Sequence, residues 1–159
     1  MKTAVIYYSL DGNCAMIAEQ AALQLKADVF RVLLADTKDR RGIAKMFWGG
    51  RMAVMHKKPE IQALAVNPGA YDLIVIGTPV WAASPAPPLA SFLEKTPIRG
   101  KKIALFCCHA GGKGRVFDKI KAMLPGNTFT GEIDFINPSK ADREETLAKL
   151  KAWIKTLSP

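Results

Sequence analysis

The stretch that decides the fold is Ala4-Val5-Ile6-Tyr7-Tyr8-Ser9-Leu10-Asp11-Gly12-Asn13-Cys14. Its first five residues are apolar or aromatic and predict a buried strand, and the polar turn after them leads into a helix that begins near Asn13. Small or apolar residues recur at helical spacing, which places one face of this helix on the core: Cys14, Ala18, Ala21 and Leu25. A strand, a short turn and a helix bring backbone N–H groups and the positive end of a helix dipole together, an arrangement that suits a phosphate.

Two common nucleotide motifs are absent from this turn. It has no lysine of the GxxxxGK[ST] type, and it has no G-x-G-x-x-G pattern. We therefore expect neither a nucleotide hydrolase nor an ordinary dinucleotide-binding fold.

Length, hydropathy and cysteine content limit the kinds of protein that this chain can be. The chain has 159 residues, and we expect a single domain over residues 1–159. It contains no run of about 20 apolar residues and no leader-like segment ahead of the first strand, so we expect no membrane span and no secretion. Cys14, Cys107 and Cys108 form no C-x-x-C pattern, and we expect reduced thiols in the cytoplasm. The histidines, His56 and His109, are isolated in sequence, so no metal site is expected.

The rest of the chain alternates between strands and helices. Further strands are expected at residues 28–34, 71–77, 102–108 and 129–135. Helices are expected over 87–94 and about 116–124, and a last one from the capping-box-like Ser139-x-x-Asp142, with a buried stripe at Leu147, Leu150, Ile154 and Leu157. Five strands alternating with helices predict a three-layer α/β fold with an open parallel sheet in the order 2-1-3-4-5. In that topology a ligand binds at the carboxyl ends of strands one and three.

The segment from residue 36 to residue 60 carries much of the net charge of +9. Its apolar residues suggest a crossover helix on one face of the sheet, and a solvated helix would account for its charge. The alternative is a docking surface for acidic redox partner proteins at the basic 38–58 stretch, to which Trp48 and the methionines would add apolar contact.

The residues Ser9-x-Asp11-Gly12-Asn13-Cys14 resemble the phosphate loop of flavodoxins, (Ser/Thr)-x-Thr-Gly-Asn-Thr. The resemblance implies that this segment encloses the phosphate of FMN: Ser9, Leu10, Asp11, Gly12, Asn13 and Cys14. Two departures are present, because Asp11 and Cys14 replace threonines. The carboxylate of Asp11 brings negative charge toward a dianion, which is unfavourable unless it turns outward or caps the helix.

Two further loops extend the resemblance over almost the whole chain, in its short form. The segment Gly77-Thr78-Pro79-Val80-Trp81 resembles the flavodoxin loop that lays an aromatic ring beside the flavin, with Trp81 as the stacking candidate. The resemblance implies that Thr78, Pro79, Val80, Trp81 and Ala82 flank the flavin ring. It likewise implies that Cys108, His109, Ala110, Gly111 and Gly112 border its pyrimidine edge, where Lys113 and His109 could face the charge of a reduced flavin.

The resemblance implies an FMN-binding electron carrier with no side chain acting as a general acid or base. One alternative is a flavin-dependent NAD(P)H reductase of quinones or similar acceptors. Another is a basic binding module that has lost its flavin, but no nucleic-acid-binding motif supports it and no nucleic acid is expected. A phosphatase is disfavoured, because no cysteine is followed six positions later by arginine.

Overall fold

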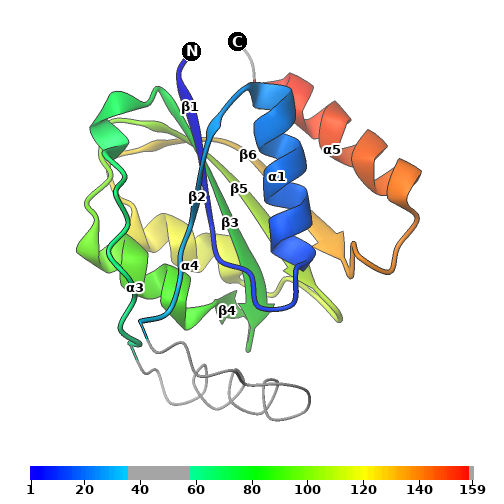
Figure 1. The fold of residues 1–159 in the computed structure, drawn as a ribbon, viewed down its shortest axis with the longest axis horizontal. Helices are drawn as coiled ribbons and strands as arrows, with labels where there is room; N and C mark the ends of the chain where they lie inside the picture. The colour runs from blue at the N-terminus through cyan, green and yellow to red at the C-terminus, as the bar shows by residue number, and fades with distance from the viewer. Residues whose placement is uncertain (36–57, 158–159) are drawn as a thin grey trace.

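The computed structural model describes residues 1–35 and 58–157. Five parallel strands form its central sheet: β1 (Thr3–Tyr7), β2 (Asp28–Arg31), β3 (Leu73–Trp81), β5 (Lys102–His109) and β6 (Thr128–Ile136). Their order is β2-β1-β3-β5-β6. The helices are α1 (Asn13–Leu25), α3 (Pro87–Lys95), α4 (Val116–Met123) and α5 (Arg143–Leu157), and a 3₁₀ turn spans Pro68–Ala70. Helices α1 and α5 cover one face of the sheet, and α3 and α4 cover the other (Figure 1).

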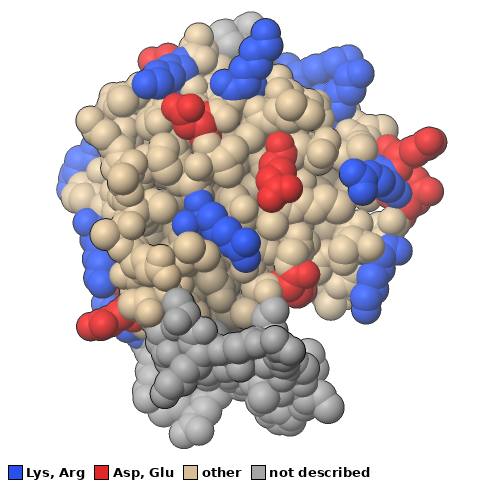
Figure 2. Space-filling view, viewed as in Figure 1, with Lys and Arg blue, Asp and Glu red and all other residues tan. Residues whose placement is uncertain are grey.

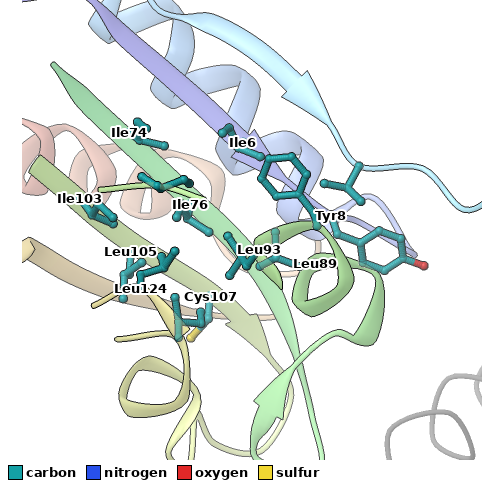
Figure 3. Close-up of a cluster of buried hydrophobic side chains, with 14 of the residues drawn as sticks. Ile6, Tyr8, Ile74, Ile76, Leu89, Leu93, Ile103, Leu105, Cys107 and Leu124 are labelled. Carbon is teal, nitrogen blue, oxygen red and sulfur yellow. The ribbon is translucent and has the colours of Figure 1, made fainter. Parts of the chain in front are cut away.

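Two apolar layers hold the sheet between its helices. Alternate residues of β1, β3 and β5 point to opposite faces, as strand geometry requires. Ile6, Ile76 and Leu105 belong to the layer under α3 and α4, together with Leu89 (Figure 3). The opposite layer packs strand residues such as Phe106 against α1 and α5. The central strands are buried on both faces, as the sequence predicts for parallel strands.

The expected α/β fold class is confirmed, and the parallel strands alone, numbered along the chain, follow the order 2-1-3-4-5. The expectation of five strands is wrong, because the sheet has a sixth strand. This strand, β4 (Ser84–Pro85), pairs antiparallel with the end of β3. Thr78–Trp81 continue β3 rather than forming a loop, because Thr78 and Pro79 pair with β5 and the last two residues pair with β4. The second strand is also shorter than expected, ending at Arg31.

The start of α5 differs from the expected one. Asp142, not Ser139, caps the helix, and its Oδ1 accepts the N–H of Glu145 at 2.8 Å. Trp153 lies on the buried face, which the sequence analysis did not anticipate, and Leu147 is only half-buried. The crossover helix expected over residues 36–60 and the docking surface around Trp48 lie outside the described residues, apart from residues 58–60, which are neither helix nor strand. Among the described helices, none has the length and apolar content needed to span a membrane.

The hairpin between β3 and β4 contains unfavourable backbone conformations. Trp81 pairs with Ser84, so Ala82 and Ala83 form a two-residue turn, with φ of 49° and 55°. Two-residue hairpins of type I′ need positive φ at both positions and favour Asn-Gly there. An alanine in the left-handed region costs roughly 1–2 kcal/mol.

We predict that the double substitution Ala82→Asn and Ala83→Gly stabilises the protein by about 1 kcal/mol. The relief of backbone strain in the turn raises the free energy of unfolding, and the greater entropy that glycine gives the unfolded chain offsets part of this gain. Urea unfolding of the flavin-free protein measures the change. Ala122→Gly, in the exposed part of α4, is the matched control and should destabilise by about 1 kcal/mol. A loss of stability in the turn variant comparable to that of the control would show that the turn is not strained.

Candidate functional site

The turn between β1 and α1 presents unpaired backbone donors at the head of a helix. Gly12 precedes α1 with φ of 93°, and a Cβ built there would meet no atom within 4 Å. Ser9 is buried, and its Oγ accepts the N–H of Gly12 at 3.2 Å. Within the described part of the chain, the N–H groups of Leu10, Asp11 and Cys14 have no acceptor. Free donors at a helix N-terminus fit the oxygens of a phosphate.

Asp11 turns its carboxylate back onto this turn. Its Oδ1 accepts the N–H of Asn13 at 3.1 Å, and its Oδ2 accepts the Nδ2 amide of Asn13 at 2.9 Å. The Asn13 Oδ1 accepts the N–H of Ser139 at 2.9 Å, which ties the turn to the segment between β6 and α5. Asp11 therefore both orders the turn and places a negative charge beside its free donors.

A cation that the sequence analysis missed lies against the same turn. Arg31, at the end of β2, donates from Nη2 to the carbonyl oxygen of Ser9 at 3.1 Å. Its position opposite Tyr7 in the sheet brings it to the carboxyl edge. The available signal was a lone arginine at the end of a strand that neighbours β1. Its positive charge opposes that of Asp11 and favours an anion at the turn.

The side chain of Cys14 lies in the core. It is fully buried under α1. Burial raises the pKa of the Cys14 thiol well above its ordinary value, and a hydrogen bond with Cys108 acts in the same direction. The thiol is thus a neutral core group, and only the backbone N–H of Cys14 is available to a ligand at the turn.

The second predicted segment lies at the end of β3. Thr78 and Pro79 are buried within the strand, and Thr78 Oγ1 accepts the N–H of Ala86 at 3.0 Å. Val80 and Trp81 are half-buried, whereas Ala82 is exposed in the hairpin turn. Of this segment, Val80–Ala82 can therefore present side chains to a ligand.

The indole of Trp81 already has an aromatic neighbour. It meets Tyr8 edge-to-face, with ring centroids 5.8 Å apart and an interplanar angle of 89°. Burial raises the pKa of Tyr8 to about 12 despite the opposing charge of Arg31, so its phenol is protonated at neutral pH. Tyr8, which the sequence analysis did not propose as a site residue, connects the first segment to the second.

The third segment follows β5, which continues to His109. Cys108 is buried in the core, whereas Ala110, Gly111 and Gly112 are exposed. A Cβ built at Gly111 or Gly112 would meet no atom within 4 Å, so the backbone here is open to close approach by a flat ligand. The accessible part of this segment is therefore backbone.

Side chains that can carry charge meet at Asp134 of β6, next to the third segment. The sequence analysis did not single out this residue. His109 Nε2 lies 3.0 Å from Asp134 Oδ2, and Lys113 Nζ lies 3.3 Å from Oδ1. Partial burial alone would raise the pKa of Asp134, but hydrogen bonds from His109 and Lys113 and the charges of Lys113 and Lys149 hold that pKa below its ordinary value. His109 and Lys113 therefore contact a carboxylate of the protein instead of pointing freely toward a ligand.

The sheet brings the three segments side by side. Gly77 of β3 pairs with Tyr7 of β1 on one side and with Phe106 of β5 on the other. A Cβ built at Gly114 would lie 2.5 Å from that of Ala83, so the hairpin touches the chain that continues the third segment toward α4. A turn with free N–H donors, an aromatic hairpin and a glycine-rich loop thus share one edge, a combination that fits a flavin mononucleotide.

Comparison with solved structures agrees with this geometry. A flavoprotein of Lactobacillus acidophilus NCFM, solved in complex with FMN, is 26% identical, with a TM-score of 0.71, over 89% of this chain and 97% of that chain. A putative flavoprotein of Bacteroides uniformis is 22% identical, with a TM-score of 0.77, over 94% and 97%. A flavodoxin from the domain Archaea is 16% identical, with a TM-score of 0.61, over 99% and 96%. The last two likenesses concern the fold alone.

A search of curated proteins gave no match. A search of protein families matched one model over residues 1–127, which include β1, β3, β5 and the three segments of the candidate site. The chain belongs to the family described as NADPH-dependent FMN reductase.

Proposed function

We propose that this protein binds FMN non-covalently at the carboxyl edge of its sheet and transfers electrons through it. The observation that carries the proposal is the meeting of three segments at that edge, one of which offers free N–H donors at the head of α1. The family match and the FMN-bound flavoprotein from L. acidophilus support FMN as the cofactor.

Specific residues would hold each part of the cofactor. The backbone N–H groups of Leu10, Asp11 and Cys14 would bind the phosphate, aided by the charge of Arg31. Trp81 would lie beside the ring, and the backbone of Ala110–Gly112 would border its polar edge. When bound, FMN supplies the one- and two-electron chemistry, and the chain supplies binding and electrostatics.

A second candidate is an NAD(P)H-dependent reductase, and the family match over residues 1–127 is the observation that favours it. A basic module without flavin has less support. On the face shown in Figure 2, the basic and acidic residues of the described chain are interspersed and do not form a single basic block.

Partner and location complete the proposal. The net charge of +9 supports acidic redox partner proteins, and the basic stretch around Trp48 is our candidate docking segment. The cysteines Cys14, Cys107 and Cys108 are all free and buried, as suits a reducing compartment such as the cytoplasm.

Titration of flavin-free protein with FMN, followed by quenching of flavin fluorescence, tests the central proposal. We expect saturable quenching with one FMN per chain. Unchanged fluorescence at protein concentrations well above micromolar would refute the proposal. Steady-state oxidation of NADPH by the FMN-loaded protein then tests the second candidate: turnover with a quinone acceptor supports a reductase, and its absence leaves an electron carrier.

Asp11→Asn should tighten binding of FMN but not of riboflavin. The substitution keeps an oxygen that can accept the N–H of Asn13, loses the bond from the side-chain amide of Asn13, and removes the negative charge beside the phosphate donors. We expect the dissociation constant of FMN to fall several-fold, which corresponds to a gain of roughly one kcal/mol in binding free energy. Riboflavin is the control ligand, because it lacks the phosphate. An equal change for both flavins would show that the charge of Asp11 does not act on the phosphate.

A further inference from the structure

The imidazole of His109 joins the third segment to the sheet, and its hydrogen bonds define its protonation. The side chain is 6% exposed. Gly112 donates its N–H to Nδ1 at 2.9 Å, so Nδ1 carries no proton. Nε2 lies 3.0 Å from Asp134 Oδ2, and an ionised carboxylate can only accept, so the proton is on Nε2. The hydrogen-bond network thus requires a neutral imidazole in one tautomer.

The bond to Gly112 is the internal anchor of an otherwise open loop. Residues 110–112 are exposed, and within the described chain this is their one hydrogen bond. The loop is fixed outside this stretch, where Asn137 N–H donates to the carbonyl of His109 at 2.9 Å and Val116 N–H donates to that of Lys113 at 3.3 Å. The hydrogen bond to His109 Nδ1 therefore holds in place the backbone that would border the flavin ring.

A second proton on the imidazole would break this anchor. It would place an N–H of His109 against the N–H of Gly112, and two donors cannot bond to each other. Three charged residues face the imidazole from the elements around it. Asp134 belongs to β6 and Lys113 to the loop, and Lys149 of α5 donates from Nζ to the carbonyl oxygen of Asp134 at 2.7 Å. Histidine changes charge between about pH 5 and 8, so the loop can respond to pH in that range.

We propose that His109 is a positioning residue that holds loop 110–112 in its flavin-accepting conformation only while its imidazole is neutral, so that flavin affinity falls when His109 gains a proton. Asp134 has the supporting role of fixing the tautomer that leaves Nδ1 free to accept. The inference rests on the proposed flavin site and adds control of that site by protons. It does not involve His109 in the chemistry of the flavin.

Riboflavin titrations across pH test the proposal. Riboflavin is the probe because it lacks the phosphate of FMN. That phosphate has a second pKa of about 6 and would add its own pH dependence. For the unmodified protein we expect the dissociation constant to rise roughly tenfold between about pH 8 and 5, a loss comparable to one hydrogen bond. His109→Gln should bind riboflavin with little pH dependence, since the glutamine carbonyl can accept the N–H of Gly112 and does not titrate. His56→Gln, which removes the other histidine of the chain, is the matched control and should keep the original pH dependence.

The outcomes separate this inference from the proposed function. Protein that binds neither riboflavin nor FMN at any pH overturns the function and the inference together. Protein that binds flavin with the same pH dependence before and after His109→Gln overturns the inference alone. A measurement without flavin adds a structural check: ¹⁵N NMR at pH 8 should show Nδ1 unprotonated, and the Gly112 amide signal should shift as His109 titrates. A Gly112 signal that ignores that titration would also overturn the proposal.

Discussion

Close, in-register packing of β1, β3 and β5 is the constraint on which the rest of this structure depends. The three strands are buried on both faces, and Gly77 lies between Tyr7 and Phe106. A Cβ on Gly77 would lie 1.9 Å from the Phe106 ring, so the middle strand can lie against its neighbour only because it has glycine there. Because the strands are parallel and aligned, the segments that follow them emerge at one edge. The candidate site is a consequence of this register.

The site is built more from backbone than from side chains. The phosphate donors that we propose are N–H groups at the head of α1, and the third segment offers the open backbone of Gly111 and Gly112. The side chains act mainly by holding this backbone in place. Asp11 Oδ1 accepts the N–H of Asn13, and His109 Nδ1 accepts the N–H of Gly112. Binding of this kind tolerates sequence change as long as the turns keep their shape. This explains how the departures at Asp11 and Cys14 are compatible with a flavodoxin-like fold.

Acidic and basic residues lie close together at this edge. Arg31 and Asp11 both contact the first turn, and Lys113 and His109 both contact Asp134 behind the third segment. Lys113, a basic residue of the described chain next to the third segment, is therefore compensated by a carboxylate of the protein. The field that a bound flavin would experience depends on close pairs such as Lys113 and Asp134, whose 3.3 Å separation is much smaller than the Debye length of about 8 Å at physiological salt.

Sequence patterns anticipated the layers and the three segments, because buried parallel strands and their glycine-rich turns have strong local signals. The β3–β4 hairpin was missed because its turn is Ala82-Ala83, which lacks the Asn-Gly signal of such turns. The cap of α5 was misplaced because Ser139 and Asp142 are both good caps, and tertiary contacts decide between them. Tyr8, Arg31 and Asp134 were missed because their roles arise from contacts between strands distant in sequence.

Mapping where FMN binds tests the account most directly. In ¹H–¹⁵N NMR spectra of the protein, saturating FMN should shift the amide signals of residues 10–14, 80–82 and 110–113, and leave those near the opposite edge, such as Gly69 and Gly100, unchanged. Omitting the phosphate by using riboflavin should remove the shifts at residues 10–14 and keep the others. Shifts that lie elsewhere on the sheet, or no shifts at all, would contradict a flavin site at this edge.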